Sequence, residues 1–232
     1  MEQFFLIVFY LIILIYSIIL HEVSHGVVAL WLGDKTAKYA GRLSLEPLRH
    51  IDLIGSIVLP IVMIVMTGFA FGWAKPVPYN PNNLRIKKWG EVIVAFSGPI
   101  TNYIIALIAA LIASMINVSV DQKMIVINNL MSAQWYAVAQ NIVGSPAMVL
   151  FTLCAMVIFW NVLLGTFNII PIPPLDGSKI LYVFFRMRPQ TQMFFEQWGF
   201  LIIIALLVIP VFSSIFYGGI MFMWNIFFYL SL

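Results

Sequence analysis

Charged side chains are scarce in this chain: Asp, Glu, Lys and Arg together make up 9% of its 232 residues. A soluble domain carries about 25%. Because 62% of the residues are hydrophobic and the mean hydropathy is +1.02, this scarcity excludes an ordinary soluble domain. The net charge of +3 is small and spread over several loops, so no nucleic-acid partner is expected.

Cysteine pairs and polar alternation are also missing. The one cysteine, Cys154, excludes an intrachain disulfide and is expected to pack as a small hydrophobic residue. The apolar runs are continuous and do not alternate with polar residues, which disfavours an outer-membrane barrel. The sequence therefore predicts an all-α polytopic protein embedded in a lipid bilayer.

Five apolar stretches approach or exceed the roughly 20 residues that a membrane helix needs. They are 4–32, 53–72, 92–116, 148–170 and 199–231. The last is interrupted by Pro210 and by Gly218-Gly219, so it is one tilted helix or two shorter ones. We expect about five to six membrane helices or re-entrant segments. The connections are too short for an added domain, so 1–232 is expected to be one membrane domain with a core at about 4–185.

Two connections look extended. Segment 41–48 begins with alternating residues, and segment 73–79 contains Pro76 and Pro78, which are incompatible with a helix. Both are predicted to be short strands at the membrane surface.

Basic residues indicate the orientation, because Lys and Arg concentrate on the cytoplasmic side. Connections 33–52 and 73–91 each carry four, whereas 117–147 carries only Lys123. A full crossing by 53–72 would place the two basic connections on opposite faces. We therefore favour a re-entrant 53–72, although hydropathy alone indicates a full span.

The first apolar stretch contains His21-Glu22-Val23-Ser24-His25. Residues four apart lie on one face of a helix, so both imidazoles can reach one metal ion while Glu22 lies close to the water on that metal. The alternative is a set of packed, hydrogen-bonded side chains. It is weak, because an acidic group near mid-bilayer costs about 2.5 kcal/mol or more. The pattern is typical of a zinc site with Glu22 as general base.

A catalytic zinc takes three protein ligands and keeps one position open. Asp176 is the favoured third ligand, because Pro171, Pro173 and Pro174 break the helix before it and irregular backbone at membrane depth has to line a site. An Asp-Gly turn is the simpler reading of the same residues. The other candidates are Asp34, Glu46, His50, Asp52 and Glu91.

These motifs together resemble the site-2 protease family of intramembrane zinc metalloproteases. The resemblance covers about 10–185 and includes Asn168-x-x-Pro-x-Pro-x-x-Asp176-Gly177 and Gly98-x-x-x-Asn102. It is closest to the small bacterial and archaeal members without PDZ or CBS domains, which implies a prokaryotic cell membrane. It implies one zinc ion per chain on His21, His25 and Asp176, and transmembrane proteins as substrates.

The resemblance also implies that Asn102 and Asn168 position substrate or stabilise the oxyanion. Gly98 and Asn102 could instead form a packing face with an interhelical hydrogen bond. Two alternatives to a protease stay open from the sequence, a metal-ion transporter and a catalytically silent membrane scaffold.

Overall fold

The computed structural model of the chain describes residues 2–59, 61–62, 65, 72 and 74–232. Its α-helices are α1 (Glu2–Trp31), α2 (Thr36–Tyr39), α4 (Gly90–Ser114), α5 (Val120–Met131), α6 (Trp135–Ile142), α7 (Pro146–Asn168), α8 (Ser178–Phe184), α9 (Pro189–Val208) and α10 (Pro210–Ser231). Three shorter helical segments are η1 (Pro47–His50), η2 (Leu53–Val58) and η3 (Pro81–Asn83). The helical class is confirmed, and no strand occurs in the part of the chain that the structure describes.

Four of these helices are long and apolar enough to cross a membrane, namely α1, α4, α7 and α10. The two halves of α9 add a fifth if they count as one span, although they are bent by 57° to each other. The stretch 199–231 belongs to two helices that meet at Ile209. That residue has an extended backbone (φ −77°, ψ 117°) because the following Pro210 disfavours the helical conformation. Gly218 and Gly219 lie inside α10 and do not interrupt it.

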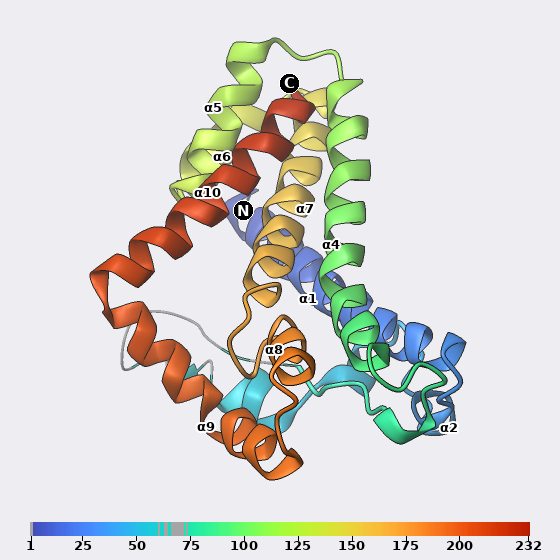
Figure 1. Cartoon of the computed structure of the whole chain (residues 1–232). Coiled ribbons are helices and arrows are strands. Elements are labelled where there is room, and N and C mark those ends of the chain that lie inside the picture. Colours follow the sequence, from blue (N-terminus) through green and yellow to red (C-terminus); the bar gives the residue numbers. More distant parts are fainter. Residues whose placement is uncertain (1, 60, 63–64, 66–71, 73) are drawn as a thin grey trace.

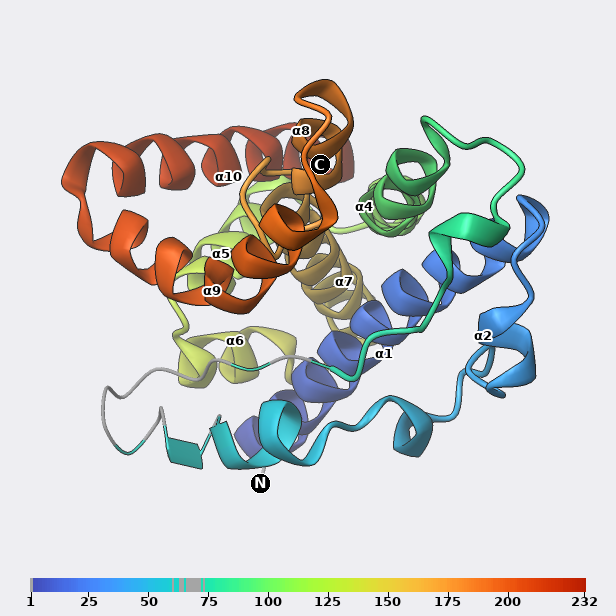
Figure 2. The same cartoon turned by 60° about the horizontal axis from the view of Figure 1, so that its bottom comes forward.

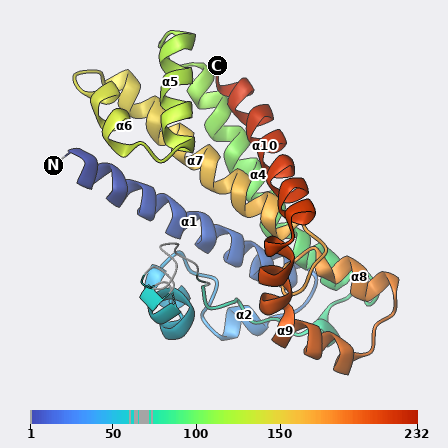
Figure 3. The ribbon, with the colours of Figure 1, turned by 90° about the vertical axis from the view of Figure 1, so that its left-hand side faces the viewer.

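Helices α4 and α7 form the centre of the bundle, and α1 and α10 pack against them from opposite sides (Figure 3). Small residues on one face of α4 make this possible. Ala106, Ala110 and Ala113 are fully buried at helical spacing and let neighbouring backbones approach closely. Phe151, Ile158 and other apolar residues of α7 fill the remaining core.

The connections gather at two ends of the bundle (Figure 1). Connection 117–147 folds into α5 and α6, which hydropathy did not indicate, and they lie together at one end. Helices α2 and α8 lie at the other end, near the start of α4. The chain from 74 onwards runs past the last turns of α1 there (Figure 2).

The two basic connections lie at the same end of the bundle and are joined to each other. Hydrogen bonds link Asp34 to Asn80 and Asn83, Lys75 to both Arg42 and His50, and Arg85 to Leu32. Both ends of the 51–74 stretch therefore lie at this end of the bundle, as a re-entrant segment requires. Much of 53–72 lies outside the described residues, so its path through the membrane stays a prediction.

Asp34 is the central group of this junction. Burial raises its pKa, but hydrogen bonds from Thr36, Asn83 and Asn80 outweigh burial and hold the pKa of the Asp34 carboxyl below its ordinary value. A carboxylate that is ionised and fully bonded is a stable anchor for two loops.

The predicted strands are absent because their backbone groups bond elsewhere. Pro76 and Pro78 have no N–H to donate. The N–H of Lys75 donates to His50, and the N–H of Val77 donates to the Glu22 carboxylate. Residues 74–80 are therefore extended without a ladder, and the expectation of a strand at 73–79 is wrong for the described part, 74–79. The 41–48 expectation is also wrong, since no strand forms there and its end, from Pro47, is helical.

Candidate metal centre

The histidine motif lies in the last third of α1, on the face toward α4 and α7. The rings of His21 and His25 are 4.7 Å apart between centroids, as the i, i+4 spacing predicts. Both side chains are buried. One ligand atom from each of His21, Glu22 and His25 lies within 4.8 Å of the others, which is close enough for one metal ion.

Asp176 reaches the same point from the connection between α7 and α8. The connection leaves α7 at Asn168 and turns back, with the Gly177 N–H donating to the Asn168 carbonyl at 2.8 Å. A Cβ at Gly177 would lie 2.1 Å from the Ile169 carbonyl oxygen, so only glycine fits this turn. The sharp turn brings the Asp176 carboxylate against the histidines.

Distances between the three side chains suit a tetrahedral ion. Asp176 Oδ2 is 3.0 Å from His21 Nε2 and 3.4 Å from His25 Nε2. Donor atoms at about 2.0–2.1 Å from a tetrahedral zinc lie roughly 3.3 Å from each other. The two imidazoles and the carboxylate therefore fit the corners of a zinc site.

The Nδ1 atoms of His21 and His25, which point away from Asp176, have partners that suit a metal site. His21 Nδ1 is 2.6 Å from Asn102 Oδ1, and His25 Nδ1 is 2.8 Å from the Val94 carbonyl oxygen. Both partners are acceptors, so each Nδ1 carries a proton, and Nε2 is the atom that each neutral ring has free for a metal ion. In the neutral rings, both Nε2 lone pairs are then on the side of the Asp176 carboxylate, where a divalent cation would be bound by all three groups.

Glu22 points to a different partner. Its Oε2 accepts a hydrogen bond of 2.9 Å from the Val77 N–H. The carboxylate is half-buried and lies beside the histidines. The hydrogen bond from Val77, in segment 74–80, thus holds the Glu22 carboxylate close to the proposed metal position.

Gly98 of α4 provides the room for both imidazoles. A Cβ there would lie 2.6 Å from His21 Nε2 and from His25 Cε1, closer than real Cβ atoms come. At Gly98, the backbone of α4 therefore comes close to the two imidazole rings. Gly98 can act as a small packing residue and also leave room for the proposed metal ligands, so the two interpretations are compatible.

Replacing Gly98 with Ala is expected to displace the imidazoles and weaken zinc binding by at least tenfold. The matched control is Gly219→Ala in α10, because a Cβ at Gly219 has open space around it. Zinc affinity of the two purified variants, measured by competition with a chromophoric chelator, checks this. Parental affinity in Gly98→Ala would contradict the close approach.

Four of the five other candidates for the third ligand are bonded elsewhere, within the connections, and the fifth, Glu91, lies in the first turn of α4. Asp34 binds Asn80 and Asn83, Glu46 pairs with Arg49, His50 bonds to the Ser44 carbonyl, and Asp52 accepts from the Gly55 N–H. Asn168 donates its amide to the Leu164 carbonyl in its own helix. Among the described side chains, Asp176 is the carboxylate that contacts both histidines.

Sequence reasoning missed Ser17 and Asn161. Both belong to the hydrogen-bond network around Asn102, and both are buried. The available signal was a polar side chain inside an apolar span, since such groups usually serve function or helix contacts.

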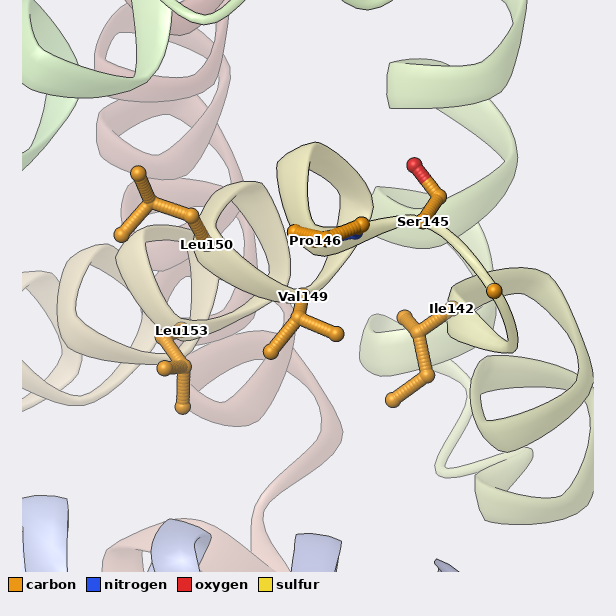
Figure 4. Close-up of a pocket in the computed structure, with 7 residues that line it drawn as sticks. Ile142, Ser145, Pro146, Val149, Leu150 and Leu153 are labelled. Atoms are coloured by element: carbon orange, nitrogen blue, oxygen red, sulfur yellow. The ribbon is translucent and has the colours of Figure 1, made fainter.

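An apolar hollow lies away from this centre, where α6 ends and α7 begins (Figure 4). Ile142, Val149, Leu150 and Leu153 line it together with Ser145 and Pro146. It lies at the start of α7, whereas Asp176 follows the end of that helix. Its lining has no titratable group, so we assign no chemistry to it.

Comparison with known proteins finds a family match and several relatives. The model of Peptidase family M50 matches residues 9–210. The chain is 31% identical over 208 residues to YwhC of Bacillus subtilis, named as a candidate zinc metalloprotease, covering 89% of this chain and 83% of that protein.

Two further relatives carry similar names. Rip2 of Mycolicibacterium smegmatis, another candidate zinc metalloprotease, is 29% identical, covering 87% of this chain and 67% of its own length. A zinc metalloprotease of Methanocaldococcus jannaschii is 25% identical, covering 73% of this chain and 32% of that protein. No solved structure matches the chain.

Proposed function

The chain belongs to peptidase family M50, the site-2 proteases, and is a multi-pass membrane zinc metallopeptidase; from this premise we propose that it cuts membrane proteins in or near their transmembrane segments. The observation that supports this most is the meeting of two imidazoles and one carboxylate between apolar helices. We further propose that 1–232 acts as one membrane protease domain, in a prokaryotic cell membrane.

We assign the zinc ligands to His21 Nε2, His25 Nε2 and Asp176. When bound, zinc lowers the pKa of a coordinated water toward about 7 and polarises a carbonyl. The side chains prepare this site in advance, because Asn102 and the Val94 carbonyl orient the two rings. Asp176 adds a negative charge, which favours binding of a divalent cation.

Glu22 is the proposed general base. It takes a proton from the attacking water and returns it to the leaving amine, as a carboxylate beside the reacting group can do. The Val77 N–H holds one carboxylate oxygen and so limits the rotation of the side chain. Because one of its carboxylate oxygens is bonded to Val77, we propose that Glu22 acts on the water and is not a fourth protein ligand of the zinc.

The substrate must be unwound, because the carbonyls of a membrane helix are already hydrogen-bonded. An extended segment could hold it by strand addition. Segment 74–80 offers few donors, since two prolines lack N–H and the Lys75, Val77 and Asn80 N–H groups are bonded. We therefore propose that the unwound substrate contacts the irregular Leu43–Leu45 segment, where Leu43 lies against Gly26, one turn beyond Glu22.

Asn102 is an unfavourable oxyanion donor in this arrangement. Its amide nitrogen donates to the Ser17 carbonyl and to Asn161 Oδ1, and its oxygen faces His21. We propose that Asn102 orients His21, while contact of Asn168 with substrate stays a prediction.

The family comparison favours proteolysis over the transporter and scaffold alternatives. The test uses purified protein in lipid vesicles with a fusion protein that contains one transmembrane helix. We expect cleavage that stops on chelation and returns on addition of zinc. A chain that binds one zinc and transports it without cutting any transmembrane substrate would overturn the proposal.

A further inference from the structure

Four polar side chains form a continuous chain through the apolar core beside the metal centre. They are Ser17 and His21 of α1, Asn102 of α4 and Asn161 of α7, with exposed fractions of 4%, 6%, 0% and 1%. Polar groups inside a membrane bundle are costly unless they are bonded, and they usually mark function. Each group donates to the next one in the direction away from the metal position, from His21 through Asn102 and Asn161 to Ser17, which donates to the Ile13 carbonyl.

The direction is set at the far end, by backbone carbonyls, which can only accept. Ser17 Oγ donates to the Ile13 carbonyl at 2.7 Å, so it accepts from Asn161. Asn161 Nδ2 donates to Ser17 Oγ at 2.8 Å and to the Val157 carbonyl at 2.9 Å. With its nitrogen held by a carbonyl and a hydroxyl, Asn161 must turn its oxygen toward Asn102.

Asn102 is oriented in turn. Its Nδ2 donates to Asn161 Oδ1 at 2.8 Å and to the Ser17 carbonyl at 3.3 Å. Its Oδ1 therefore faces His21 Nδ1, at 2.6 Å. An oxygen acceptor at this place stabilises the tautomer with the proton on Nδ1 and leaves the Nε2 lone pair directed at Asp176.

We propose that Ser17 and Asn161 are positioning residues for zinc, which act through Asn102 to hold His21 in its metal-binding tautomer. This rests on the zinc ligands proposed above. These hydrogen bonds join α1, α4 and α7, so the packing of α7 also affects which ring nitrogen of His21 carries the proton. Outer partners of this kind typically change metal affinity by 10–100-fold when removed.

Two variants test the positioning role of Ser17 and Asn161. Asn161→Leu removes the group that orients Asn102, and Ser17→Ala removes the hydroxyl that orients Asn161. The matched control is Thr152→Val, because Thr152 is a buried polar residue of α7 whose side chain, among the described residues, bonds only to Met148 of its own helix. Zinc affinity by chelator competition is expected to fall 10–100-fold in the first two and to change less than about twofold in the control.

A second measurement separates positioning from general destabilisation. Nitrogen NMR of histidine-labelled apo-protein, at a pH where the imidazoles are neutral, reports the tautomer of each of the three histidines. In the parent we expect His21 protonated on Nδ1. In Asn161→Leu we expect mixed tautomers for His21 only, because His25 is held separately by the Val94 carbonyl.

The outcomes are distinct. Parental zinc affinity and an unchanged His21 tautomer in folded Asn161→Leu and Ser17→Ala would overturn the positioning role of Ser17 and Asn161. The proposed zinc ligands would be unaffected by that result. Equal changes at His21 and His25, or a loss of affinity in Thr152→Val of the same size, would mean a structural role and also overturn it. A parent chain that binds no zinc would overturn the proposed function itself. If Asn161→Leu does not fold, Ser17→Ala decides the result.

Discussion

Replacing Glu22 with Gln should lower the rate of peptide cleavage by 10²-fold or more while zinc stays bound. The physical reason is that Glu22 acts on a proton, and removal of a required general base has a cost of this size. Gln keeps the carbonyl oxygen that can accept from the Val77 N–H, so segment 74–80 is expected to stay in place. Cleavage of a model transmembrane substrate and zinc content are measured on the same preparation.

The matched control for this variant is Glu46→Gln. Glu46 lies on the surface and pairs with Arg49, away from the histidines. An exposed ion pair contributes about 0–1 kcal/mol, so this variant should keep activity and zinc. Undiminished cleavage by Glu22→Gln would remove Glu22 from the role of base, whereas loss of zinc from it would indicate that Glu22 is a ligand.

Replacing Asp176 with Ala should reduce zinc binding and proteolysis together. The carboxylate lies against both imidazoles, so its removal takes away one of three proposed ligands and the negative charge of the site. We expect zinc to be lost during dialysis against a mild chelator that leaves the parent loaded. Metal analysis after dialysis, followed by an activity assay with added zinc, measures both effects.

Asp52→Ala is the control for loss of a carboxylate. Asp52 accepts a hydrogen bond from the Gly55 N–H at the start of η2, so its removal should cost about 1 kcal/mol of local stability and no zinc. If Asp176→Ala kept its full zinc while Asp52→Ala or Glu46→Ala lost it, the third ligand would be one of the connection residues instead.

The histidine motif illustrates what local periodicity can predict. His21 and His25 are four residues apart on a single helix, so their common face follows from helix geometry without knowledge of any other element. The end of α7 is local in the same sense, because Pro171 and the prolines after it prevent the helix from continuing. Family membership was recognisable from these same residues.

The surroundings of the motif depended on packing between helices. Asn161 carries no motif of its own, and its role follows from a neighbour 59 residues earlier in the chain, Asn102, and another 144 residues away, Ser17. In the described part of the strand expected at 73–79, residues 74–79, no strand formed, because His50 and Glu22 accept from the Lys75 and Val77 N–H groups. Neither contact has a sequence spacing from which it could be read.

By itself, then, the sequence determined the membrane class, the HExxH face of α1 and the broken backbone before Asp176, since hydropathy, helical period and proline act over a few residues. The sequence favoured Asp176 as a partner of His21, but only the tertiary structure shows their contact across 155 residues, and only it decided that Asn102 turns its oxygen toward that ring. The close approach of α4 to α1 at Gly98 was decided there as well. The reason is physical: the direction of a buried hydrogen bond depends on which acceptors the neighbouring helices bring, and only the packed bundle defines those neighbours.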